Sequence, residues 1–171
     1  MRTITRLARL TSAGMFLVTG VAKAQATKEQ AAVAAALRGG QHVALGAGIA
    51  AASAAGTPIS ARYEVEDGKL QLSVFIQKDG AYSEVFVDHM TGKVAKTDKI
   101  TGGDDMKDAK AQSRAFAKAK STLASALDRA LAANAGYTAV DVTPVLEGGH
   151  PVAEVTLMKD GKFKAVAEPL G

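Results

Sequence analysis

One stretch of the chain, from Pro58 to Val94, constrains the fold more than any other. Apolar residues occupy every second position from Ile59 to Val65, and again from Leu70 to Ile76. This period of two is typical of strands that bury one face and expose the other. The stretch therefore predicts β-structure with a well-defined inner face.

Asp-Gly pairs separate the strands of this stretch. Asp67-Gly68 lies between the first two strands, and Asp79-Gly80 leads into a third from Tyr82 to Asp88. Two-residue hairpin loops require positive φ at both central positions, which Asp and Gly adopt at low cost. The sequence thus predicts a three-stranded antiparallel meander.

Residues 1–24 have the three-part composition of a secretory signal peptide. Three arginines within the first nine residues precede an apolar run over residues 13–18, and small residues fit cleavage after Ala24 or Ala26. The apolar run is shorter than the ~20 residues that a bilayer crossing needs. We therefore expect a periplasmic or secreted protein whose mature chain does not span the membrane.

Charge and cysteine content exclude several classes of function. The chain has 21 basic and 17 acidic residues, but four of the basic and none of the acidic residues lie in the predicted signal peptide. The mature chain is therefore neutral, so nucleic acid is not expected as a partner. The chain has no cysteine, which excludes disulfides, thiolate metal ligands, a cysteine nucleophile and a lipid-modified cysteine.

Two Ala-rich helices are expected before the meander. Thr27 and Gln30 match a capping box and predict a short helix over residues 27–39, which Gly39-Gly40 ends. A second helix is predicted over residues 42–55, where the small residues allow close packing on a sheet.

The region after the meander is predicted to begin with a polar linker over residues 96–108. High helix propensity then predicts one helix over residues 109–135, with Asp104, Asp105 or Asp108 as its cap. Strands follow, with a turn at Asp160-Gly161.

The second half of the chain repeats the order of the first. Helix, strand, strand, Asp-Gly turn and strand are expected over residues 40–95 and again over residues 109–171, and Asp79-Gly80 corresponds to Asp160-Gly161. The sequence therefore predicts an α+β fold of two repeats, each a helix packed on its own small antiparallel meander.

The first repeat resembles a PepSY domain. The resemblance lies in the Ala-rich helix that reaches Gly56, in residues 64–69 (E-V-E-D-G-K), and in residues 85–94, V-F-V-D-H-M-T-G-K-V. The second repeat has E-P-L-G at residues 168–171 in place of this last motif. PepSY domains are modules of exported bacterial proteins and of the propeptides of thermolysin-type proteases. The resemblance implies a helix on an antiparallel sheet, an extracytoplasmic location, a role in peptidase inhibition or local regulation, and no catalytic residues.

Asp88, Thr91, Gly92 and Lys93 in this motif are interpreted as a structural turn. A Walker A phosphate loop requires an upstream glycine and a Ser or Thr after the lysine, and both are missing here. Asp suits the acceptor position of a turn, and Gly suits a position with positive φ.

No catalytic, cofactor or metal residues are predicted. His42, His89 and His150 lack zinc-ligand spacing. Glu64 and Glu66 are the best carboxylate pair for acid–base chemistry, but the alternation that buries Tyr63 places them in solvent, where their pKa values stay ordinary.

These observations predict a non-enzymatic binding or regulatory module, with an extracytoplasmic peptidase or envelope protein bound through a sheet edge. The alternative is a periplasmic small-ligand carrier that holds its ligand between the helix over residues 42–55 and the sheet.

Overall fold

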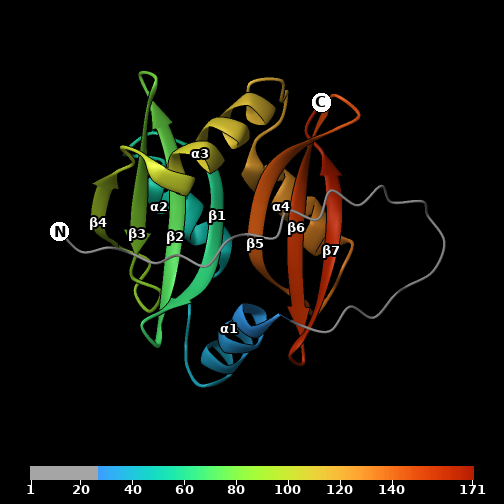
Figure 1. Cartoon of the computed structure of the whole chain (residues 1–171). Helices are drawn as coiled ribbons and strands as arrows, with labels where there is room; N and C mark the ends of the chain where they lie inside the picture. Colours follow the sequence, from blue (N-terminus) through green and yellow to red (C-terminus); the bar gives the residue numbers. More distant parts are fainter. Residues whose placement is uncertain (1–26) are drawn as a thin grey trace.

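A computed structural model describes residues 27–171, so the predicted signal peptide lies outside the described residues. The described chain is an α+β protein organised around one seven-stranded antiparallel sheet, with the strand order β4-β3-β2-β1-β5-β6-β7 (Figure 1). The strands are β1 (Thr57–Glu66), β2 (Lys69–Lys78), β3 (Ala81–Val87), β4 (Val94–Lys99), β5 (Thr138–Glu147), β6 (His150–Lys159) and β7 (Lys162–Pro169).

Four helices cover this sheet. They are α1 (Lys28–Arg38), α2 (Leu45–Ala52), α3 (Gly103–Phe116) and α4 (Leu123–Ala132). In Figure 1, α2 and α4 lie behind the sheet and α3 crosses in front of it. The capping box of α1 is present, because Gln30 N–H donates to Thr27 Oγ1 at 3.1 Å and Thr27 N–H donates to Gln30 Oε1 at 3.0 Å. No helix in the described chain combines the length and apolar character that a membrane crossing needs.

The predicted division into two separate helix-on-meander repeats is wrong. β1 pairs with β5 in antiparallel register, with Ala61 opposite Val142 and Arg62 opposite Asp141, so both meanders belong to one sheet. Alternation along a strand defines its buried face but not the strand beside it. Joining β1 to β5 over these two residue pairs satisfies part of the backbone groups of two edges that would otherwise be exposed.

The joined sheet supports one main hydrophobic core on the side of α1, α2 and α4. Leu72 on β2, Leu127 on α4 and Leu157 on β6 are at most 1% exposed and belong to the same cluster. A side chain at Gly48 on α2 would place its Cβ 2.7 Å from Leu72 Cδ2. Leu72 therefore packs directly against α2 at this position.

The region after the meander departs from its prediction. Residues 96–108 are not a linker, because they form most of β4 and the first turns of α3. The predicted helix over residues 109–135 is two helices, α3 and α4, which lie on opposite faces of the sheet. The N-cap of α3 is Gly102, which provides no side-chain cap, and Asp104 and Asp105 lie in the first turn of the helix. Asp108 lies inside α3 and does not cap it.

A second, smaller cluster forms where α3 packs on the sheet. Ile59, Phe75, Ile100 and Ala109 are its buried members. A register shift between Pro58 and Ser60 at the start of β1 lets Ile59 and its neighbour Ser60 both be buried.

Candidate functional site: the β4 edge and its hairpin loop

The motif at residues 85–94 forms the hairpin between β3 and β4. Asp88 Oδ1 accepts hydrogen bonds from Met90 N–H at 3.0 Å, Thr91 N–H at 2.7 Å and Thr91 Oγ1 at 3.0 Å. Gly92 has φ +71° and donates its N–H to the Asp88 carbonyl at 2.8 Å, while Lys93 O accepts from Asp88 N–H at 2.8 Å. Asp88, Thr91, Gly92 and Lys93 therefore close a tight turn that determines where β4 begins.

The loop rests against the segment that precedes α2. Val43 donates its N–H to the His89 carbonyl at 2.8 Å, and a Cβ at Gly92 would lie 3.4 Å from Val43 Cγ1. The Tyr63 hydroxyl donates to the Val43 carbonyl from the inner face of β1. Burial raises the pKa of Tyr63 to about 12, which favours the protonated phenol that donates this bond.

The Asp88 carboxylate makes the loop sensitive to acid. The Thr91 backbone N–H, helped by the Thr91 hydroxyl, holds the pKa of Asp88 below its ordinary value of 3.8. A lowered pKa means that ionised Asp88 stabilises the folded loop above about pH 4, and that this contribution is lost as the pH falls through the folded-state pKa. We expect Asp88→Asn to reduce stability at neutral pH, and the difference from wild type to shrink in acid. Urea unfolding from neutral pH to about pH 2 checks this, and a pH-independent difference would contradict it.

β4 is an edge strand whose outer backbone groups are available. Ile100 N–H, just past the end of β4, donates to the Tyr82 carbonyl at 3.0 Å, and Thr97 lies opposite Val85. Backbone groups along an antiparallel strand point alternately toward and away from the partner strand. Asp98 and Lys96 therefore bond to β3, whereas the N–H and C=O groups of Thr97 and Lys99 point outward.

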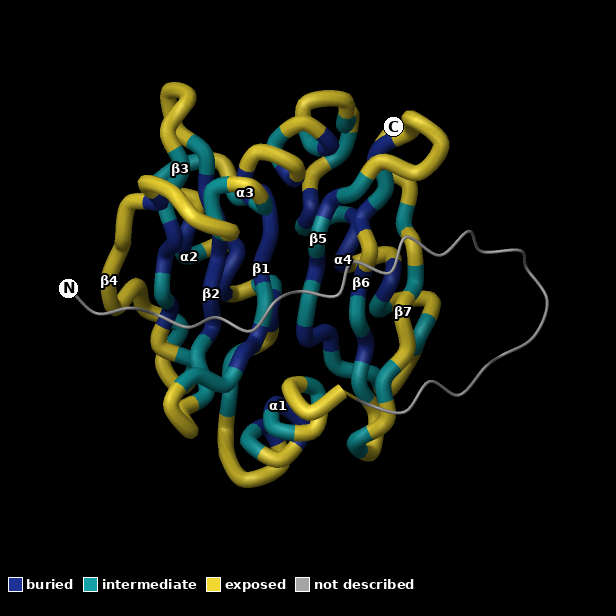
Figure 2. Tube along the Cα trace, viewed as in Figure 1, coloured by how far each residue is buried: buried dark blue, intermediate teal, exposed yellow. Residues whose placement is uncertain are grey.

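All six residues of β4 are exposed, and Figure 2 shows the strand as the most exposed edge of the sheet. Met90 in the preceding loop is 54% exposed and Val94 at the start of β4 is 45% exposed. Leu146 is the other exposed large hydrophobic residue in the described chain. Two apolar side chains thus lie in water beside an unpaired strand edge.

Two features of β4 limit its tendency to aggregate. A register shift between Phe86 and Val87 leaves Ala95 outside the regular pairing. Lys96 lies 4.3 Å above the Phe86 ring and makes an ion pair with Asp98 at 2.6 Å. Bulges and charged side chains on an edge oppose unselective pairing, which leaves Thr97 and Lys99 as the regular part of the edge.

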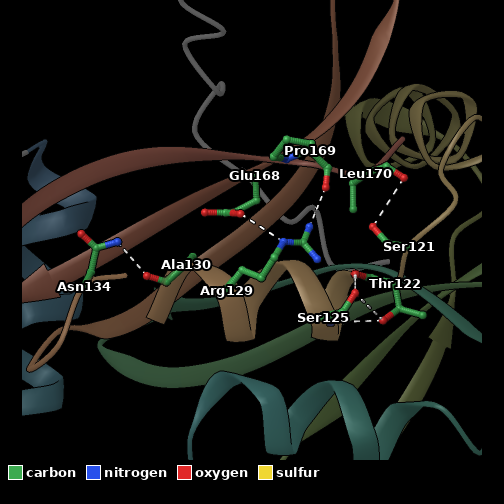
Figure 3. A network of polar contacts seen from close by, with 9 residues as sticks. All are labelled: Ser121, Thr122, Ser125, Arg129, Ala130, Asn134, Glu168, Pro169 and Leu170. Carbon is green, nitrogen blue, oxygen red and sulfur yellow. Dashed lines mark hydrogen bonds and ion pairs between the residues drawn. The ribbon is translucent and has the colours of Figure 1, made fainter. Parts of the chain in front are cut away.

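The opposite edge of the sheet is partly closed by α4 and the segment before it. Arg129 Nη2 donates to the Pro169 carbonyl at 2.6 Å and its Nε to Glu168 Oε2 at 3.3 Å. Ser121 donates to the Leu170 carbonyl from the same side at 3.4 Å. Figure 3 shows Arg129 reaching from α4 to the end of β7. At its C-terminal end, β7 therefore has fewer backbone groups available for pairing with another strand than β4 has.

A small pocket of about 370 Å³ lies where β4 ends. Tyr82 and Ile100 from the sheet and Met106 from α3 line it, together with Lys99 and Lys110. A wider groove of about 780 Å³ lies at the end of α2 and is lined by residues 53–58, residues 77–79, Ser113, Phe116 and Ala117.

Both carboxylates of the candidate acid–base pair have polar partners in the structure. Glu64 is 8% exposed, contrary to the prediction that it lies in solvent, because β1 is an interior strand and Arg62 contacts the Glu64 carboxylate at 2.9 Å. Glu66 accepts a hydrogen bond from Gln71 Nε2 at 3.0 Å.

Elsewhere on the sheet, burial and the nearby Glu147 and Asp141 carboxylates raise the pKa of Glu154. No group of three or more potential metal ligands occurs among residues 27–171.

The hairpin turns lie at the predicted pairs, and both residues of Asp67-Gly68, Asp79-Gly80 and Asp160-Gly161 have positive φ. Sequence reasoning assigned residues 96–108 to a linker and therefore missed most of β4 and the pocket beside it. Residues 95–99 expose both faces of the strand and carry no apolar alternation, which is the signal that reveals a half-buried strand. Val94 at the start of β4 and Ile100 just past its end are the large apolar residues that could have indicated a strand here.

Comparison with known proteins adds little to this geometry. No protein-family model matches the chain, and no curated protein matches it. A solved structure of a protein from Clostridium difficile 630, proposed to be a lipoprotein, aligns with 67% of this chain and 75% of its own chain, at 17% identity and a TM-score of 0.35. Similarity at this level defines neither the fold nor the function of the chain.

Proposed function

We propose that the mature chain is an exported, non-enzymatic binding module of the PepSY type, which binds an extended segment of a partner protein along β4. The observation that carries this proposal is the outward-facing backbone of Thr97 and Lys99 on a fully exposed edge strand. An added strand gains main-chain hydrogen bonds at such an edge, and neighbouring side chains give specificity.

The exposed apolar residues support the same location. Met90 and Val94 lie at the start of β4, so a partner strand paired with Thr97 would pass beside them and remove their apolar surface from water. The motif that resembles PepSY domains is the turn that places both residues. The resemblance and the exposed edge therefore point to the same hairpin.

The resemblance also suggests the class of partner. Because PepSY-like modules occur in propeptides of thermolysin-type proteases, the proposed role is regulation of an extracytoplasmic peptidase. Residues 27–171 should slow hydrolysis of a peptide substrate by thermolysin, and Thr97→Pro should restore the rate. If the rate of hydrolysis stays unchanged over a wide range of concentrations of residues 27–171, the peptidase is not the partner. The proposal that the chain is a binding module would then stand without it.

Peptide selection tests the binding module itself. Two libraries of random decapeptides are offered to residues 27–171, one displayed with free C-termini and one embedded between carrier sequences. Binders are expected whose affinity falls about tenfold or more in Thr97→Pro but not in Thr97→Val, because only the proline removes the outward N–H. If no peptide from either library shows this dependence, the proposed function is wrong.

A further inference from the structure

The pocket where β4 ends lies on the face of the sheet that α3 covers. Tyr82 and Ile100 line it from the strands and Met106 from α3, and all three belong to the smaller cluster beneath α3 or pack against it. Its volume of about 370 Å³ lies near the lower end of the ~300–1,000 Å³ range of ligand pockets. A site of this size and lining suits one large apolar side chain.

The exposed apolar residue at the start of β4 lies on the opposite face of the sheet. Val94 lies opposite Val87, and Val87 lies opposite Leu72 in the main core. Residues directly opposite each other on neighbouring strands share a face, so Val94 lies on the face of α2. The two ends of β4 therefore offer an apolar contact on different faces.

The register of β4 determines how far apart these contacts lie along an added strand. Thr97 and Lys99, whose backbone groups point outward, lie on the face of α2, and Ile100 lies on the face of α3. Ala95 lies outside the regular pairing and does not count toward the alternation. The six-residue step from Val94 to Ile100 therefore corresponds to five residues of a regular partner strand, and an odd step places its two side chains on opposite faces.

We infer that the partner segment carries two large apolar side chains five residues apart, an inference that rests on the proposed function. One packs beside Val94 on the face of α2, and the other enters the pocket beside Ile100 and Met106 on the face of α3. The residues between them supply the main-chain hydrogen bonds to β4. The spacing is the same for a parallel and an antiparallel partner, because strands of either direction alternate faces with a period of two. A regularly amphipathic strand, whose apolar residues share one face, would fill only one of the two contacts.

Alanine scanning of the selected peptide tests this inference. The tightest peptide from either library is synthesised with each residue in turn replaced by alanine, and the affinities for residues 27–171 are measured by calorimetry. Two replacements, five residues apart, are expected to weaken binding about tenfold or more each, because each removes a buried apolar side chain. A different spacing, or only one sensitive position, would overturn the inference.

Variants of the protein assign each sensitive position to its contact. Val94→Ala and Met106→Ala should each weaken binding of the parent peptide about threefold or more, and should leave unchanged the peptide that already has alanine at the corresponding position. Unchanged binding of that peptide also shows that the variant is folded. Lys107→Ala, beside Met106 but outside the pocket, and Leu146→Ala, exposed like Val94 but on β5, are the matched controls and should change neither peptide.

The outcomes separate this inference from the proposed function. If the parent and the alanine peptides respond equally to Val94→Ala and to Met106→Ala, the two contacts are not the ones inferred. Sensitivity of the same peptides to Thr97→Pro would then preserve the edge-binding function, because that variant removes only a main-chain donor.

Discussion

Replacing Leu157 with alanine is expected to lower the free energy of unfolding of the whole described chain by about 3 kcal/mol. Leu157 lies on β6 with no exposed surface, within the cluster that also contains Leu72 on β2. Removing a buried leucine costs about 2–5 kcal/mol, from lost burial and from the cavity that remains. Because one sheet and one core connect the two halves, this loss should appear in both.

Amide exchange during urea unfolding measures this effect in each half. Val74 on β2 and Val155 on β6 should lose protection together in Leu157→Ala. Leu146→Ala is the matched control, since Leu146 is 42% exposed on β5, and it should change stability by less than about 1 kcal/mol. Loss of protection at Val155 with Val74 unaffected would mean that the halves fold independently.

Thr97→Pro is expected to weaken binding of a strand-forming peptide by about tenfold or more while the chain remains folded. The Thr97 N–H points away from β3, so proline removes no hydrogen bond of the sheet. Proline is tolerated at such edge positions, but it offers an added strand no donor there. Thermal unfolding and peptide titration of the same preparation separate the two effects.

Asp98→Pro is the informative companion to this variant. Asp98 lies opposite Glu84 and its N–H points toward β3, so proline at this position removes a bond of the β3–β4 hairpin and should lower stability by about 1–3 kcal/mol. If Asp98→Pro left stability unchanged and Thr97→Pro lowered it, the assignment of the two N–H groups would be wrong. The Thr97 N–H would then point toward β3 and the Asp98 N–H away from it.

The parts of the fold that sequence predicts well are those determined by neighbouring residues. Alternation along β1 and β2 defines their buried faces, and the Asp-Gly pairs place the turns between them. Thr27 and Gln30 likewise define the start of α1 through contacts three residues apart. Each of these signals is complete within about ten residues.

The parts that sequence could not predict depend on pairing between distant segments. Ala61 and Val142 are small and apolar, and nothing in either strand specifies the other as its neighbour. Glu64 was expected in solvent because it alternates with buried Tyr63, but β5 makes β1 an interior strand of the sheet, and Glu64 is buried there. The break between α3 and α4 follows from the same cause, since the two helices cover opposite faces of the sheet.

The candidate site illustrates this limit. The hairpin loop at Asp88 was visible in the sequence, but β4 was not, because an exposed strand needs no apolar alternation. The pocket forms where the start of β3, the end of β4 and α3 come together. The exposed edge and the pocket therefore required the structure.

Hydrogen exchange at the β4 backbone tests the account most directly. Amide exchange of Thr97 and Lys99 is measured by NMR in residues 27–171, free and saturated with the selected peptide. Binding is expected to slow exchange at both amides at least about tenfold and to leave Asp98, already bonded to β3, less affected. Unchanged exchange at Thr97 and Lys99 in the saturated complex would place the partner elsewhere and contradict the account.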